Sequence, residues 1–139
     1  MNMFRNCETL KKLELPSCFN TENVINMIGV FQNCNNLEEL KLSSYFNTQN
    51  VKNMMGMFAY CKQLKELELP SCFNTKNVLN MLGMFACCEN LEKLHFPSSF
   101  NTQKVISMAH MFYGCKYFNN FDSSSFHSIN KDIPLVKPL

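Results

Sequence analysis

The sequence is poor in glycine, proline and charge. Four Gly and five Pro among 139 residues are too few for a collagen-like or linker sequence. Charged residues make up 17% of the chain and apolar residues 46%, a balance that excludes intrinsic disorder and predicts a folded core. The length is that of one compact domain.

Long apolar runs and a strong net charge are also missing. The longest apolar stretches, such as residues 81–88, extend over about eight residues, whereas a bilayer crossing needs roughly 20, so we expect no transmembrane segment. Thirteen basic and 11 acidic side chains leave a net charge of +2, which is too small for non-specific nucleic-acid binding. The first residues show neither a basic-then-apolar progression nor a small-residue cleavage site, so no secretory signal is expected there.

A repeat of 27 residues organises the sequence. The tripeptide Phe-Asn-Thr begins at Phe19 and returns at the same interval three more times. The same step connects the cysteines Cys7, Cys34, Cys61, Cys88 and Cys115, the phenylalanines Phe4, Phe31, Phe58, Phe85 and Phe112, and the leucines Leu13, Leu40, Leu67 and Leu94. A fixed period between 20 and 50 residues predicts a solenoid, in which one supersecondary unit stacks on copies of itself.

Each repeat carries the pattern of one short strand. Leu-x-Leu at residues 13–15 has the two-residue period of a strand with one buried face, and Pro16 ends it. Val24, Met27 and Phe31 then have the i, i+3, i+7 spacing of a short helical turn. The sequence therefore predicts an α/β fold, a solenoid with one parallel sheet and short helical turns or loops on the other side.

The two ends depart from the repeat. We expect residues 1–125 to form one repeat domain of about four full turns with partial turns at both ends. Residues 126–139 lose the pattern, which predicts a degenerate C-terminal cap or tail. The sequence starts inside a repeat without a polar cap, so the first strand would expose its edge. We expect that the natural protein either continues upstream or shields this edge by self-association.

The eight cysteines are the first candidates for chemistry. Five share one repeat position, and side chains in such a ladder point in the same direction, so we interpret them as reduced, buried core residues. No Cys-x-x-Cys is present and the three histidines fall at different phases of the repeat, so no zinc site is expected. Copper binding by methionine and cysteine is a less favoured alternative to core packing. Because no residue breaks the repeat to form a catalytic pocket, we predict no enzyme and no cofactor.

The outward positions of the strands are the candidate recognition surface. They differ from repeat to repeat, and we predict protein binding through Lys12, Glu14, Glu39, Lys41, Glu66, Glu68, Lys93 and His95. Their charges mostly alternate between neighbouring strands, which also fits a solvated face that only fixes the stacking order. Glu39 and Glu66 interrupt this alternation as an adjacent acidic pair. The alternative surface lies on the other side of the repeat, around Tyr60, Cys87 and Tyr113.

One part of the repeat carries a family signature. Val51, Met54, Met57, Phe58 and Cys61 form Val-x-x-Met-x-x-Met-Phe-x-x-Cys, which resembles the BspA-like leucine-rich repeats of bacterial surface lipoproteins, adhesins and protist proteins. The resemblance covers residues 3 to about 125. It implies a leucine-rich-repeat-like solenoid that binds proteins or attaches to host surfaces, and it implies no catalytic residues.

These observations predict a non-enzymatic protein-binding repeat module. By resemblance it would be surface-associated and act in adhesion or in host or partner interaction. The missing secretory signal and the reduced-looking thiols favour the alternative of a cytosolic scaffold or substrate-recognition module. A soft-metal, copper-binding protein is the least favoured alternative, and the identity of the protein partner is left open.

Overall fold

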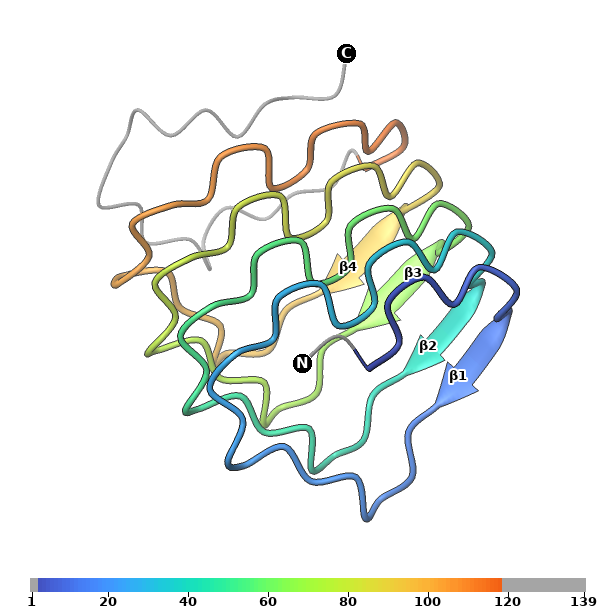
Figure 1. The fold of residues 1–139 in the computed structure, drawn as a ribbon. Coiled ribbons are helices and arrows are strands. Elements are labelled where there is room, and N and C mark those ends of the chain that lie inside the picture. Colours follow the sequence, from blue (N-terminus) through green and yellow to red (C-terminus); the bar gives the residue numbers. More distant parts are fainter. Residues whose placement is uncertain (1–2, 119–139) are drawn as a thin grey trace.

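The structure is a computed structural model that describes residues 3–118 of the chain. It contains four short strands, β1 (Lys12–Glu14), β2 (Glu39–Lys41), β3 (Glu66–Glu68) and β4 (Lys93–His95), one in each repeat. β1 pairs with β2 and β3 with β4, both in parallel, with Leu13 beside Leu40 and Leu67 beside Leu94. All four strands lie along one side of the fold (Figure 1). The described chain is therefore repetitive and β-rich, with two small parallel sheets.

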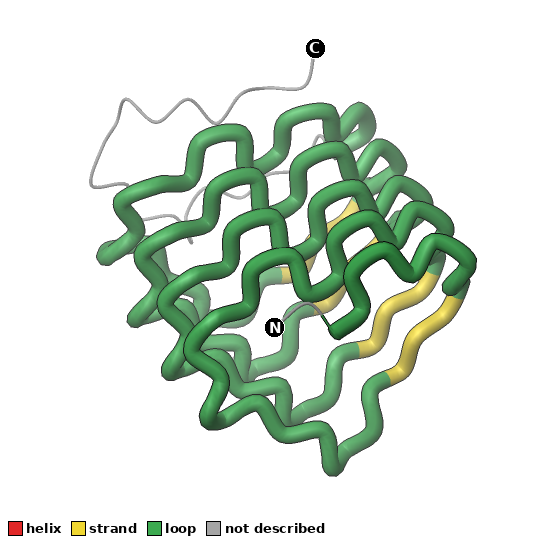
Figure 2. Tube along the Cα trace, viewed as in Figure 1, coloured by secondary structure: helices red, strands yellow, loops and turns green. Residues whose placement is uncertain are grey.

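The remainder of each repeat consists of turns that also run beside their equivalents in the next repeat (Figure 2). Isolated parallel bridges connect Asn26 to Asn53, Asn53 to Asn80 and Asn80 to Ser107. Each of the three asparagines also accepts, through its side-chain oxygen, a hydrogen bond from the amide two residues later. The asparagine side chains thus close turns whose backbone is already paired with the neighbouring repeat.

The helical part of the α/β prediction is wrong for residues 3–118, because turns and loops occupy the side opposite the strands and no helix is present there (Figure 2). Gly29 has a φ of 58°, and the equivalent glycines of the next two repeats share this left-handed backbone, which a helix does not allow. The amides of Met27 and Phe31 donate to carbonyl groups of the following repeat, both at 2.9 Å. These donors serve pairing between repeats instead of hydrogen bonds within a helix.

The core consists of residues that return every 27 positions. Ring centroids of Phe31 and Phe58 lie 5.4 Å apart, and those of Phe58 and Phe85 lie 5.3 Å apart, with the rings nearly parallel. Phe46 and Phe73 form part of a second column of rings, with centroids separated by 6.4 Å. Because identical side chains in neighbouring repeats pack face to face, the array buries rings that a single repeat would leave half exposed.

The cysteine ladder lies inside this core. Cys34, Cys61, Cys88 and Cys115 are buried, and all eight cysteines of the chain are free. The Cys61 thiol donates to the carbonyl oxygen of Phe31 at 3.3 Å, and the other three make the same contact with the equivalent phenylalanine. The prediction of buried, unpaired thiols is confirmed for these four residues, whereas Cys7 in the first repeat is only half-buried.

Within residues 3–118, no helix is long and apolar enough to cross a membrane. The expected end of the repeat domain at residue 125 and the expected cap or tail at residues 126–139 lie outside the described residues.

The buried thiols should resist thiol reagents in the folded protein. Burial raises the pKa of Cys88 well above its usual value and that of Cys115 to about 12, so their reactive thiolates are scarce at neutral pH. A hydrogen bond with Cys61 lowers the pKa of Cys34, so the protection of Cys34 depends on its burial in the core. In mass-spectrometric labelling with iodoacetamide, we expect the exposed Cys18 to react in the native protein and the four buried thiols to react only after denaturation. Rapid native labelling of the buried four, or disulfides among them, would contradict the structure.

Replacing Leu67 with Ala should destabilise the fold strongly. Leu67 is 1% exposed and has neighbours in the repeats on both sides, and loss of a buried leucine costs about 2–5 kcal/mol. The matched variant Leu13→Ala should cost less, because Leu13 occupies the same position in the first repeat and is half-buried. Urea denaturation of both variants tests the difference, and equal losses would argue against the packing described above.

Candidate functional site: the charged strand face

All eight predicted binding residues lie in the four strands. Each strand places its central leucine against the core and its first and last residues in solvent. The outward residues are Lys12 and Glu14 in β1, Glu39 and Lys41 in β2, Glu66 and Glu68 in β3, and Lys93 and His95 in β4. We call this set the strand face. Two-residue periodicity is sufficient to explain its exposure, because successive side chains of a strand point to opposite sides.

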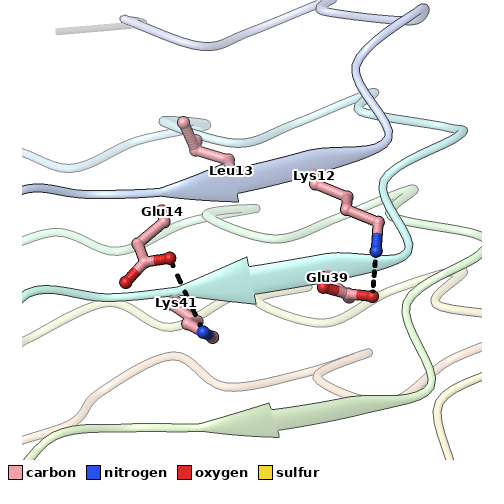
Figure 3. Close-up of a pocket in the computed structure, with 5 residues that line it drawn as sticks. All are labelled: Lys12, Leu13, Glu14, Glu39 and Lys41. Carbon is pink, nitrogen blue, oxygen red and sulfur yellow. Dashed lines mark hydrogen bonds and ion pairs between the residues drawn. The ribbon is translucent and has the colours of Figure 1, made fainter.

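Ion pairs join β1 to β2 across the strand face (Figure 3). Lys12 Nζ lies 2.6 Å from Glu39 Oε1, and Lys41 Nζ lies 3.5 Å from Glu14 Oε2. The hydrogen bond and the charge of Glu39 raise the pKa of Lys12 above its usual value. All four side chains are more than half exposed, so water and salt screen these pairs. Their main structural effect is to favour one register between the two repeats.

A second group of ion pairs joins β3 to β4. Glu66 Oε1 lies 3.1 Å from His95 Nε2, and Glu66 Oε2 lies 3.9 Å from Lys93 Nζ. One carboxylate therefore faces two basic side chains of the next strand. His95 contributes charge to this group only when it is protonated.

The boundary between β2 and β3 differs from the other two. β2 and β3 are neighbours, yet the described residues form no strand pairing between them, so the strands divide into two sheets. Each ion pair within the described strand face joins β1 to β2 or β3 to β4. The division coincides with Glu39 and Glu66, which occupy the same position of adjacent strands. Like charges in such positions repel each other, and each carboxylate instead contacts a basic group on its other side.

A shallow hollow of about 280 Å³ lies over β1 and β2 (Figure 3). Its lining consists of Lys12, Leu13, Glu14, Glu39 and Lys41. The lining includes two cations and two carboxylates on the outward side of the strands, and Leu13 points to the other side of β1 (Figure 3), so the hollow offers charge of both signs over a small area. Enclosed ligand pockets usually have volumes of roughly 300–1,000 Å³. The hollow over β1 and β2 is therefore shallow and charged rather than an enclosed ligand pocket.

Sequence reasoning missed a second charge ladder outside the strand face. Glu89 lies between Lys116 at 2.6 Å and Lys62 at 3.2 Å, in three successive repeats. Hydrogen bonds from Lys116 and Lys62 lower the pKa of Glu89 below its usual value. The signal was present in the sequence, because residues 62, 89 and 116 share one repeat position and alternate in sign. Alternation is thus a property of stacked positions in general and does not by itself identify a binding face.

The alternative surface lies among the turns. Tyr60 is 41% exposed and Tyr113 is 47% exposed, while Cys87 is half-buried. Tyr60 and Cys87 have left-handed backbones with φ of 64° and 59°. The structure thus exposes aromatic side chains on the turn side.

The methionines of the copper alternative are core residues. Met27, Met54, Met81 and Met108 are 0–5% exposed and belong to the hydrophobic core, as the packing interpretation predicts. Within residues 3–118, no three His, Cys, Asp or Glu side chains are grouped so that they could hold a metal ion.

Comparison with known proteins gives a family but no function. Residues 1–126 match the family described as "Mycoplasma protein of unknown function, DUF285". No curated protein and no solved structure matches the chain. The matched segment contains all of the 27-residue repeats, so the family corresponds to the repeat itself. The chain therefore belongs to the DUF285 family.

Proposed function

We propose that the chain is a non-enzymatic protein-binding repeat module, a solenoid of the BspA-like leucine-rich-repeat type, and that its partner binds the strand face. One observation carries this proposal. Every strand keeps its leucine against the core, whereas the flanking outward residues change from Lys/Glu to Glu/Lys, Glu/Glu and Lys/His. A constant scaffold with variable exposed positions is the arrangement by which repeat proteins present binding surfaces.

The backbone beneath the strand face supports specific binding because it is ordered in advance. Thr48 and Thr75 are fully buried, and each hydroxyl donates to a carbonyl of the following repeat at 2.7–2.8 Å. The corner after each strand is therefore fixed to its neighbour. A surface that is already ordered loses little conformational entropy on binding, so more of the contact energy contributes to affinity.

The charge pattern indicates a partner with a basic group near the centre of the strand face. Glu39 and Glu66 lie on adjacent strands, and both are more than half exposed. A lysine or arginine of the partner placed between them would interact with two carboxylates and reduce their mutual repulsion. Such contacts contribute mainly to specificity and to the association rate.

Adhesion at a cell surface follows from the BspA-like resemblance, with a cytosolic scaffold as the second candidate. The observation in favour of the scaffold is the eight free cysteines, since disulfides are favoured in oxidising compartments and thiols in reducing ones. Labelling of intact cells with a membrane-impermeant reagent distinguishes the two. Labelled protein on intact cells supports adhesion, and labelling only after lysis supports the scaffold.

Reversing both central carboxylates should weaken partner binding. With partners captured on the intact chain and identified by mass spectrometry, we expect the purified partner to bind Glu39→Lys/Glu66→Lys at least about tenfold more weakly. Added salt should weaken binding to the native chain, and far-ultraviolet circular dichroism should not change. The control Glu8→Lys/Glu22→Lys changes the net charge equally at exposed positions outside the strand face.

Two results would oppose this assignment. Equal loss of affinity in the control would indicate a non-specific charge effect. Binding that survives the double reversal but is lost in Tyr60→Ala/Tyr113→Ala would place the contact on the turn side.

A further inference from the structure

β1 is an edge strand. Within residues 3–118 it pairs with β2 alone. Leu15 N donates to Lys41 O at 3.0 Å, and Lys11 O accepts hydrogen bonds from the second repeat. In a strand, the backbone groups of alternate residues face opposite edges. Because residues 11 and 15 face β2, the backbone groups of Lys12 and Glu14 face the open edge.

Residues 3–11 do not pair with this edge. Phe4 N donates to Val30 O at 3.0 Å and Asn6 N donates to Gln32 O at 2.8 Å, so this segment lies against the turn side of the first repeat. The edge therefore presents two amide donors and two carbonyl acceptors, from residues 12 and 14, with no backbone partner among the described residues. Unpaired edges of this kind are templates for another strand.

The apolar interior is also open at this end. Four core positions of the first repeat are half-buried, whereas the same positions of the second repeat are 0–6% exposed; Leu15 of the first repeat is itself buried. The half-buried residues are Leu10, Leu13, Phe19 and Val24, and their buried equivalents are Leu37, Leu40, Phe46 and Val51. A segment that pairs with this edge would therefore also need an apolar face to cover these four side chains.

The charges of β1, Lys-Leu-Glu, are complementary to those of a second copy of β1 that runs antiparallel to it. In an antiparallel pair centred on Leu13, Lys12 of one copy lies opposite Glu14 of the other, and the same contact occurs twice around the two-fold axis. The outward backbone groups of residues 12 and 14 then form two hydrogen-bonded residue pairs, which require the donors and acceptors that the edge presents. Opposite charges in directly opposed positions stabilise such pairs. β3, with Glu-Leu-Glu, would place carboxylate against carboxylate in the same arrangement.

The ion pairs within the chain are compatible with this contact. Lys12 already contacts Glu39, and a second carboxylate would place it between two acids. The structure contains the equivalent arrangement with the signs exchanged, because Glu89 lies between Lys62 and Lys116. The charge ladder would continue from one copy into the next.

We propose that two copies of the chain associate through β1, which pairs antiparallel with its counterpart around a two-fold axis at Leu13. Self-complementary contacts of this type are typical of two-fold symmetric dimers. Pairing completes the hydrogen bonds of the edge and covers the apolar positions of the first repeat. Lys12 and Glu39 share an ion pair, but the dimer is measured on the chain alone and partner binding with the purified partner, so either proposal can fail without the other.

Charge reversal at the edge tests the pairing by sedimentation equilibrium of the full chain. We expect the native chain to be a dimer, and Lys12→Glu and Glu14→Lys each to raise the dimer dissociation constant at least about tenfold. An equimolar mixture of the two variants should form a heterodimer, because each acidic edge then faces a basic one. Lys41→Glu is the matched control, since it also removes an ion pair with Glu14 but lies on the paired strand β2. It should dimerise as the native chain does.

Lys12→Pro examines the backbone contact separately. Proline removes the outward amide of residue 12 and is tolerated on edge strands, so we expect a folded monomer with native circular dichroism. Three results would overturn the proposal: a native chain that remains monomeric because another segment covers β1, single variants that dimerise as tightly as the native chain, or a mixture that fails to form the heterodimer.

Discussion

Pairing between residues 27 positions apart is the constraint on which the whole structure depends. Met54 N donates to the repeat that follows it at 2.8 Å, while Lys52 N donates to the repeat before it at 2.9 Å. Each repeat thus uses its backbone to hold both neighbours, and a shift of register would break the strand pairs and the turn pairs together. Stacked rings such as Phe31 and Phe58 follow from this pairing, because equivalent residues are brought to the same height in successive repeats.

The features that follow from the 27-residue period could be predicted from the sequence, whereas the conformation of the turns could not. The period, the strands at residues 12–14 and their equivalents, the buried thiols and the exposure of all eight predicted binding residues follow from spacing alone. The prediction allowed helical turns or loops on this side, and the structure has turns and loops there, because Met27 and Phe31 have a spacing that turns also satisfy when their amides bond to the next repeat. Only the left-handed φ of Gly29, repeated at each equivalent glycine, separates the two, and a glycine in the sequence does not specify its φ.

The sequence did not predict the division between β2 and β3, although the charge pattern that coincides with it was visible. Adjacent glutamates at positions 39 and 66 were recognisable as an interruption of the alternating charges. Whether repulsion is relieved by side-chain movement, by ions or by loss of strand pairing depends on the balance between hydrogen bonds and exposed charge. The sheet divides at this boundary, while the turns on the opposite side stay paired through Asn53 and Asn80.

Charge alternation in this fold therefore has two separable consequences. Where signs alternate, as in Lys62, Glu89 and Lys116, side chains satisfy one another across repeats and contribute to register. Where alternation stops, each side chain still has an ion-pair partner on one side, and we propose that its other side is available to a molecule outside the repeat. It stops at two places on the strand side, at the Glu39 and Glu66 boundary and at the open edge of β1. The first leaves an excess of one sign, which suits a partner of opposite charge. The second leaves Lys12 and Glu14 together, which suits a second copy of the same strand.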